Sequence, residues 1–222
     1  MCTLMKLKSI TLFTANLVDT FHFYKDTLEC PVQIINAMAF KVTIGETQLL
    51  FQKSHEMNQP FYHFAIDIPY NHFNEMKRHY LNILFLLTEK GQHTATFDTF
   101  YAHSFYFNDP SGNVVELIAR NSNISDYAQF IRISEIGFVC NDLLNVYAAL
   151  SDYHLQTVNH AYPTAENFNF IGDSQDESYI ILTSEEKKWD FSDQSSKAYP
   201  IKIETTRFTL SYINEQWFID NK

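Results

Sequence analysis

Glycine is scarce in this sequence, with five residues in a chain of 222. Loops that cradle phosphate groups depend on glycine, because it lets backbone N–H groups approach the ligand closely. The chain also contains no GxSxG motif and no HExxH motif. These absences argue against nucleotide binding, against serine-hydrolase chemistry of the nucleophile-elbow type and against zinc-peptidase chemistry.

Basic residues are also few. The chain has 16 Lys and Arg against 26 Asp and Glu, which gives a formal net charge of −10. Nucleic acids and anionic membrane surfaces are bound by clustered Lys and Arg. We therefore expect neither a nucleic-acid partner nor a membrane partner.

Cysteine is limited to Cys2, Cys30 and Cys140, which are scattered and form no CxxC pair. An odd, dispersed set predicts a reducing compartment and buried thiols, not a disulfide framework. No apolar run approaches the roughly 20 residues of a membrane helix. The N-terminal residues also lack the apolar core and cleavage site of a signal peptide. We expect a cytoplasmic protein.

Hydrophobic residues make up 45% of the chain and aromatic residues 16%, which is typical of a globular protein with a full core. These residues follow an internal repeat. Three segments each read as an alternating strand, a turn and an amphipathic helix: SITLFTANLVDTFHFY from Ser9, HFAIDIPYNHFNEMKR from His63 and EIGFVCNDLLNVYAAL from Glu135. Extended segments follow each helix, and a fourth, shortened unit begins near residue 199. The repeat predicts βαβββ modules and an α+β fold.

The repeated units cannot bury their sheet faces alone, so they must pair. Two full units predict a first domain over residues 1–122. A third unit and the short fourth unit predict a second, reduced domain over residues 130–222. The polar segment RNSNISDYAQF joins them.

Alternation along the three opening strands assigns a face to each side chain. Six large apolar residues share one parity and should pack under the helices: Ile10, Leu12, Phe64, Ile66, Ile136 and Phe138. Small and polar residues share the other parity: Ser9, Thr11, His63, Ala65, Glu135 and Gly137. This second face is typical of a cavity lining.

The segment SFYFNDPSGNVVELIAR, residues 104–120, reads as a hairpin with Glu116 inside an apolar strand. If the loop is DPSG, Asn108 pairs with Asn113, and Glu116 lies opposite Phe105 with His103 on the same face. A shift of one residue would move His103 to the other face. A buried carboxylate needs a partner or a cation. The alternative is a strand whose Glu116 faces water.

The segments ITLFTANLVDTFHFYKDTLEC, YHFAIDIP and YFNDPSGNVVELIAR resemble the vicinal oxygen chelate superfamily, which contains glyoxalase I, bleomycin-resistance proteins and extradiol dioxygenases. The resemblance covers residues 7–120 and extends less closely over 130–205. It implies paired βαβββ modules that form cupped mixed β-sheets with helices on the outer face. It also implies a divalent metal ion in the cup and a homodimer.

The resemblance places metal ligands at His63 and Glu116, and such a pair suits Zn²⁺, Mn²⁺, Fe²⁺ or Ni²⁺. The first module departs from the pattern, because Ser9 stands where the family has histidine and Leu49 offers no ligand at the closing strand. A third ligand would be His103 or a residue of the second domain such as Glu135. The second domain is otherwise expected to be a structural partner or lid.

Two functions follow from the resemblance. The first is a metal-dependent enzyme of the lyase, isomerase or dioxygenase type that acts on a small oxygen-rich molecule. In that function Glu116 is catalytic, and His103 is a third ligand or an acid–base group. The second is a metal-free protein that binds or sequesters a small molecule, such as a drug, in an aromatic cavity. Trp189 and Phe191 are expected either as a flap over that cavity or as a linker packed on the sheet.

Overall fold

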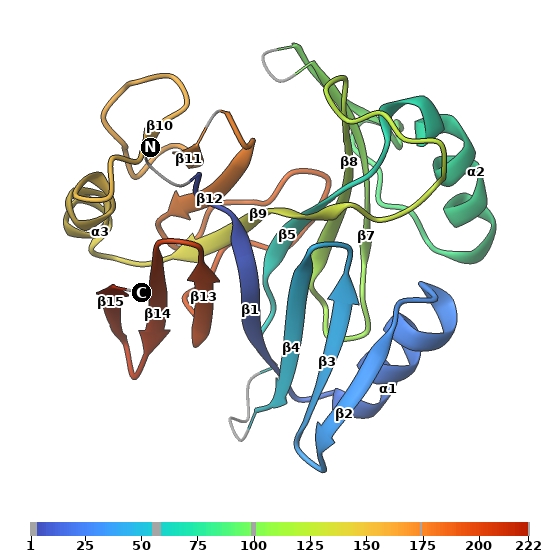
Figure 1. The fold of residues 1–222 in the computed structure, drawn as a ribbon, viewed down its shortest axis with the longest axis horizontal. Helices are drawn as coiled ribbons and strands as arrows, with labels where there is room; N and C mark the ends of the chain where they lie inside the picture. The colour runs from blue at the N-terminus through green and yellow to red at the C-terminus, as the bar shows by residue number, and fades with distance from the viewer. Residues whose placement is uncertain (1–3, 55–58, 99–100, 174, 222) are drawn as a thin grey trace.

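The computed structural model describes residues 4–54, 59–98, 101–173 and 175–221, so Cys2 lies outside the described residues. The fold is α+β, with two mixed sheets side by side and the helices at the periphery (Figure 1). The predicted fold class is confirmed. The chain contains three strand–helix–strand modules and one module made of strands alone.

The first module comprises β1 (Leu7–Thr14), α1 (Leu17–His22), the π-helix η1 (Phe23–Thr27), β2 (Val32–Asn36), β3 (Ala39–Ile44) and β4 (Thr47–Lys53). The second comprises β5 (His63–Asp67), the 3-10 helix η2 (Tyr70–His72), α2 (Phe73–Ile83), β6 (Ala95–Phe97), β7 (Ala102–Asn108) and β8 (Val114–Arg120). The third comprises β9 (Arg132–Val139), α3 (Leu143–Ser151), β10 (Gln156–Thr157), β11 (Asn169–Asp173) and β12 (Ser178–Thr183). The fourth comprises β13 (Ile201–Thr205), β14 (Phe208–Ile213) and β15 (Gln216–Asn221).

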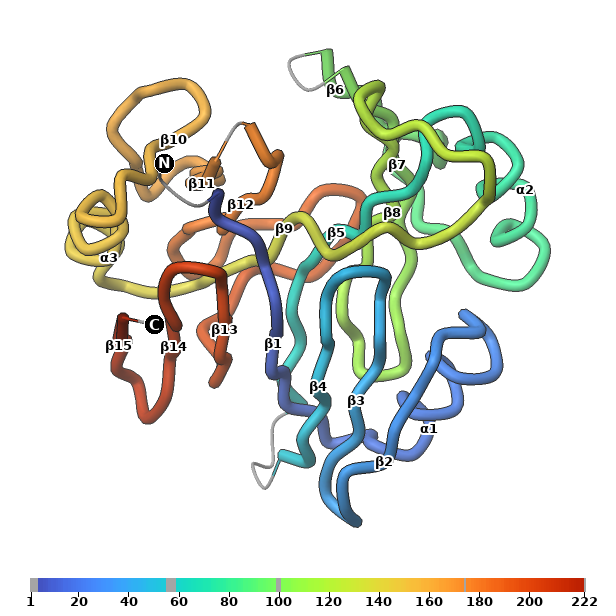
Figure 2. Tube along the Cα trace, in the orientation of Figure 1, coloured from blue at the N-terminus to red at the C-terminus, as the bar shows by residue number. Residues whose placement is uncertain are grey.

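The two sheets combine modules that are distant in the sequence. One has the strand order β15-β14-β13-β1-β4-β3-β2 and joins the fourth module to the first. The other has the order β10-β11-β12-β9-β5-β8-β7-β6 and joins the third module to the second. Figure 2 shows the chain crossing between them. Each sheet therefore draws on both of the predicted domains, 1–122 and 130–222, and the division into those domains stays a prediction.

One hydrophobic core joins the two sheets and the helices. The six apolar residues predicted to face the helices are all fully buried in this core, which confirms the assigned parity. Met76 and Tyr80 of α2 and Val146 and Leu150 of α3 belong to the same cluster. The opposite face of the strands is thereby left for the small and polar residues.

The structure also tests the prediction that the cysteine thiols are buried. Cys30 and Cys140 are buried free thiols, as predicted, and burial raises their pKa to about 12 and about 11, respectively. Such thiols are poor nucleophiles.

The longest described helix, α2, has 11 residues, and none of the described helices is long and apolar enough to cross a membrane.

Candidate functional site

Three acidic or basic side chains converge on one face of the second sheet. His63 opens β5, Glu116 lies on β8 and Glu135 lies on β9, and one potential ligand atom from each lies within 4.8 Å of the others. Ala65 pairs with both Glu116 and Glu135, so the two carboxylates flank it on neighbouring strands. The small side chain of Ala65 leaves space between them.

His63 is oriented by the backbone. Its Nδ1 atom lies 3.0 Å from the carbonyl oxygen of Val114, and its Nε2 atom lies 3.6 Å from Oε2 of Glu116. Burial lowers the pKa of His63 to about 4, so the ring is neutral at pH 7. A neutral ring that donates from Nδ1 to the carbonyl presents the lone pair of Nε2 toward Glu116. Metal-binding histidines are commonly fixed in this way.

Glu116 is 3% exposed, so the alternative of a strand facing water is wrong. Its Oε1 atom has no hydrogen-bond partner among the described residues. Burial, and then the negative charge of Glu135, raises the pKa of Glu116 to about 8. A carboxylate oxygen that faces the lone pair of His63 requires either a proton or a cation between them.

Glu135 is held by a buried arginine. Arg120 is fully buried, and it donates to Glu135 and Asp67 and, at 3.0 Å, to the hydroxyl oxygen of Ser134. Burial raises the pKa of Glu135 to about 6, and the charge of Arg120 opposes that shift. Arg120 thus fixes one oxygen of Glu135 and partly neutralises it.

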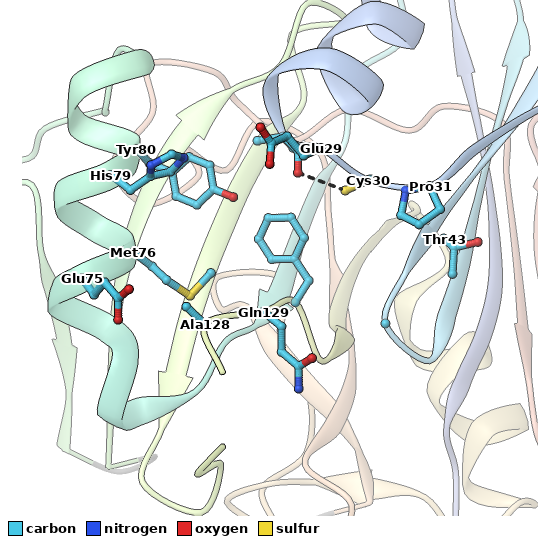
Figure 3. A pocket seen from close by; sticks show the side chains of 13 residues that line it. Glu29, Cys30, Pro31, Thr43, Glu75, Met76, His79, Tyr80, Ala128 and Gln129 are labelled. Carbon is cyan, nitrogen blue, oxygen red and sulfur yellow. Dashed lines mark hydrogen bonds between the residues drawn. The ribbon is translucent and has the colours of Figure 1, made fainter. Parts of the chain in front are cut away.

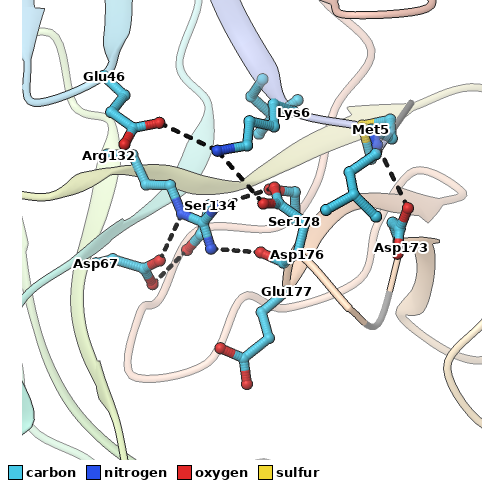
Figure 4. A network of polar contacts seen from close by, with 12 residues as sticks. Met5, Lys6, Glu46, Asp67, Arg132, Ser134, Asp173, Asp176, Glu177 and Ser178 are labelled. Atoms are coloured by element: carbon cyan, nitrogen blue, oxygen red, sulfur yellow. Dashed lines mark hydrogen bonds and ion pairs between the residues drawn. The ribbon is translucent and has the colours of Figure 1, made fainter. Parts of the chain in front are cut away.

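Asp67, which pairs with Arg120, also belongs to a wider polar network (Figure 4). Arg132 donates from Nε to Asp67 at 3.0 Å and from Nη1 to Asp176 at 2.9 Å. Lys6 lies 3.6 Å from Asp176 and 3.4 Å from Glu46, so Glu46 balances its charge. The rest of the network contains four buried carboxylates, those of Asp67, Glu116, Glu135 and Asp176, and two guanidinium groups, that of buried Arg120 and that of half-buried Arg132. When all are ionised, two negative charges are uncompensated.

The structure does not bring His103 to this cluster. In the hairpin Tyr106 pairs with Glu116 and His103 pairs with Ala119, so the predicted register is wrong by one residue. His103 lies on the opposite face, where its Nε2 is 3.4 Å from the hydroxyl of Tyr70 and its ring is 5.7 Å from that of Phe73. It cannot act as a ligand beside Glu116 from that position.

The loop explains the shift in register. The amide of Asp109 donates to the carbonyl of Asn113 at 3.1 Å, so only Pro110, Ser111 and Gly112 form the loop. Gly112 has a φ of +83°, which is typical of a three-residue hairpin loop. The side chain of Asp109 stabilises this form by accepting from the amides of Ser111 and Asn113, at 2.9 and 3.0 Å.

The cluster lines a small cavity of about 120 Å³, room for about four water molecules. Its remaining walls are mostly aromatic. Phe168 and Trp189, which both line it, stack with centroids 4.7 Å apart at 9°. Tyr106 also lines it and is backed by Phe191, outside the lining, at 4.8 Å and 11°. The ring of Trp189 lies 4.8 Å from that of His63. Such walls suit a flat ligand.

Trp189 and Phe191 belong to the segment 184–199, which covers the cavity. Trp189 is 3% exposed and lies against Gly137 of β9, where a Cβ atom would come within 2.9 Å of the indole. The side chain of Gln194 donates to the carbonyl of Gly112 at 2.9 Å and ties the segment to the hairpin. Trp189 thus packs on the sheet and also lines the cavity, whereas Phe191 packs on Tyr106 outside the lining.

Sequence reasoning missed several residues of the site. Arg120 could have been found, because alternation in VVELIAR places Glu116, Ile118 and Arg120 on one face. Phe168 and Asp190 also line the cavity, but they lie outside regular strands, and no periodic signal points to them.

The first sheet has no equivalent cluster among the described residues. Ser9 pairs with Gln48 and Thr11 with Leu50, so Leu50, not Leu49, is the counterpart of Glu116. Leu49 is fully buried in the core. The corresponding position on β12 is Ile181, which pairs with Gly137. Of the four equivalent positions in the second sheet, three therefore carry potential ligands, namely His63, Glu116 and Glu135, and the fourth carries the apolar Ile181.

These residues fit a divalent cation. One histidine nitrogen and two carboxylates form a donor set that suits Zn²⁺, Mn²⁺, Fe²⁺ or Ni²⁺. The unpartnered Oε1 of Glu116 and the two uncompensated negative charges are both satisfied by such an ion. The chemistry of the donor set does not select one of these metals.

Comparisons with known proteins agree with this architecture. Residues 133–187 match the family model described as toxoflavin-degrading enzyme. A candidate dioxygenase from Bacillus subtilis has a TM-score of 0.59 at 11% identity, over 99% of this chain and 85% of that chain. Lactoylglutathione lyase from Agrobacterium tumefaciens aligns at 17% identity over 51% of this chain and 92% of that chain, with a TM-score of 0.44. No curated protein sequence matches the chain.

The similarity to the Bacillus subtilis structure extends over nearly the whole chain. At 11% sequence identity, this structural similarity concerns the fold alone. The predicted resemblance is confirmed at that level: the chain shares its fold with this dioxygenase-like protein.

Proposed function

We propose that this protein is a divalent-metal-dependent enzyme that acts on a small, flat, oxygen-rich molecule in the cavity of the second sheet. His63, Glu116 and Glu135 would hold the ion. The observation that carries the proposal is the convergence of these three side chains within 4.8 Å, with an unpartnered oxygen of Glu116 among them.

The bound ion would act as a Lewis acid that stabilises negative charge on a substrate oxygen. The chain supplies the remaining elements of the site. The carbonyl of Val114 orients His63, and Arg120 orients Glu135. The stacked pairs Phe168–Trp189 and Tyr106–Phe191 would hold a planar substrate and exclude water.

The ligand set favours proton transfer over ring cleavage. Ring-cleaving iron enzymes use two histidines and one carboxylate, whereas this cluster contains one histidine and two carboxylates. Glu116 would be ionised as a ligand of the cation, so the proton would be held elsewhere. Asp190, whose pKa burial raises, lines the same cavity and is a candidate for that role. A lyase or isomerase is therefore the class we favour.

The proposal is tested by metal addition after treatment with a chelator. Zn²⁺, Mn²⁺, Fe²⁺ or Ni²⁺ at about one hundred times its dissociation constant should stabilise the native state by about 2.7 kcal/mol. For a chain of this length such a gain raises the melting temperature by roughly 5–10 °C. Glu116→Gln and Glu135→Gln should abolish the rise. His103→Gln is the matched control and should retain it.

A rise that His103→Gln abolishes and Glu135→Gln retains would contradict the proposed ligand set. No rise with any of the four metals would favour the second candidate, a metal-free protein that binds a small molecule in the same cavity. The contact between Arg120 and Glu135 supports that alternative, because it reduces the charge available to a cation. The cytoplasmic location and the homodimer stay predictions.

A further inference from the structure

A second and larger cleft lies between the first two modules. Its volume is about 450 Å³, within the usual range of small-molecule sites. Residues after η1, the β3–β4 turn, α2 and the segment 128–130 form its walls. Figure 3 shows Met76, His79 and Tyr80 of α2 across the cleft from Glu29, Cys30 and Pro31. It shares no lining residue with the cavity at His63.

Tyr80 presents an unused polar atom to this cleft. The residue as a whole is 6% exposed, but its hydroxyl oxygen is not among the enclosed polar atoms that lack a partner; it makes no hydrogen bond to the described residues and is open to the cleft. Burial raises the pKa of Tyr80, so the hydroxyl remains a neutral donor and acceptor. Figure 3 shows its oxygen directed away from α2, into the cleft. Because the hydroxyl is accessible from the cleft and is not used by the protein itself, it is free to accept a hydrogen bond from a ligand.

Glu29 supplies a negative charge beside it. The two carboxylates in the lining differ, because Glu75 lies 2.7 Å from Nδ1 of His72, whereas no ion pair engages Glu29 within the described parts of the chain. Neither lysine nor arginine lines the cleft. An anionic ligand would therefore meet repulsion here, and a cation would find an unpaired carboxylate.

The walls also offer an aromatic surface. The rings of Tyr80 and Phe130 are parallel within 9°, with centroids 6.2 Å apart, and Met76 adds an apolar side chain. Aromatic faces attract organic cations, and the hydrocarbon body of such a ligand would pack against Phe130 and Met76.

We propose that this cleft binds a small organic ammonium ion with an aromatic or alkyl body. The ammonium group would donate hydrogen bonds to Glu29 and to the hydroxyl oxygen of Tyr80. The site is independent of the proposed metal centre. A Cβ atom at Gly45 would lie 1.8 Å from the carbonyl oxygen of Ile131, so the β3–β4 turn packs directly against the segment that connects the second and third modules. A ligand in the cleft therefore contacts the junction between the modules.

The test is calorimetric titration of the full chain with phenethylammonium, with 2-phenylethanol and 3-phenylpropionate as neutral and anionic analogues. We expect phenethylammonium to bind at least tenfold more tightly than either analogue. Glu29→Gln should weaken its binding at least tenfold, and Tyr80→Phe should weaken it about threefold or more. Glu166→Gln, an exposed glutamate outside the cleft, is the matched control and should leave binding unchanged.

Glu116→Gln should also leave phenethylammonium binding unchanged, which separates this site from the metal centre. Circular dichroism melting of each variant establishes that it is folded. Equal binding of phenethylammonium and 2-phenylethanol would overturn the proposal, as would binding that Glu29→Gln leaves intact. The absence of binding up to about 10 mM phenethylammonium would also overturn it.

Discussion

At the scale of single residues, Glu116 and His63 impose opposite pH dependences on the metal-free protein. The pKa of Glu116 is raised to about 8 from an ordinary 4.5, so its contribution to stability is full below pH 4.5 and is lost as pH rises through 8. The pKa of His63 is lowered to about 4 from 6.5, so its contribution is full above pH 6.5 and is lost as pH falls through 4. Between pH 6.5 and 8 Glu116 therefore dominates this pair.

We expect the melting temperature of the metal-free protein to fall by several degrees between pH 6.5 and 8.5, measured by calorimetry. The fall should be much smaller in Glu116→Gln, which has no proton to lose. A fall of equal size in both proteins would show that another group is responsible.

Asp109 illustrates a residue whose motif suggests function but whose contacts are structural. It is 4% exposed and accepts hydrogen bonds from two backbone amides, from the Asn113 side chain at 2.8 Å and from the Tyr24 hydroxyl at 2.9 Å. We expect Asp109→Ala to cost roughly 2–4 kcal/mol of unfolding free energy in urea denaturation, because it leaves buried donors without partners. Asp126→Ala, at an exposed position, should change it by less than about 0.5 kcal/mol.

At the scale of elements, the covering segment 184–199 can be monitored through Trp189. The chain has two tryptophans, so Trp217→Phe leaves Trp189 as the sole indole. Its emission should be blue-shifted, because the ring is 3% exposed, and Ni²⁺ should quench it because the ring lies 4.8 Å from His63. Zn²⁺, which is not paramagnetic, should not quench it. Equal effects of the two ions, or no quenching by Ni²⁺, would contradict a metal beside this ring.

Strand alternation was sufficient to predict the elements and their faces, but it did not fix the hairpin register. Parity predicts His63 and Glu135 on the cavity face, since an alternating strand has only two faces, whereas the family resemblance assigns Glu116 to the site. The length of a hairpin loop decides which residues of the two strands pair. The prediction for His103 assumes that all four residues of DPSG form the loop, whereas Asp109 is paired with Asn113 and the loop has three residues. The side chain of Asp109 stabilises this loop through local contacts to Ser111 and Asn113 and a tertiary one from Tyr24, and alternation along the strands reports none of them.

At the scale of the whole molecule, the proposed metal centre depends on both halves of the chain. His63 and Glu116 lie before the connecting segment and Glu135 lies after it. We expect residues 1–122 expressed alone to be insoluble or unfolded and to lack metal binding, because β1 and β5 each lose a neighbouring strand. Co-expression with residues 123–222 should restore soluble protein and the metal-induced rise in melting temperature. A soluble, cooperatively folded 1–122 fragment would instead support it as a domain.

The exchange of modules between sheets could not be predicted from the repeat. All three opening strands carry the same alternating pattern, so each edge is equally able to pair with another module. The choice of β13 for β1 and β9 for β5 depends on packing across the complete molecule, such as the hydrogen bond of 2.6 Å from the Tyr62 hydroxyl to the carbonyl of Pro200.

The pairing of β1 with β13 has a consequence for synthesis. β1 ends at Thr14 and its antiparallel neighbour begins at Ile201. Ribosomes add about 5–20 residues per second, so one edge of β1 waits roughly 10–40 s for its partner. During this time the nascent chain presents an open strand edge, which is a template for pairing with other chains. The nascent chain is therefore prone to aggregate through the edge of β1 until β13 has been synthesised and has paired with it.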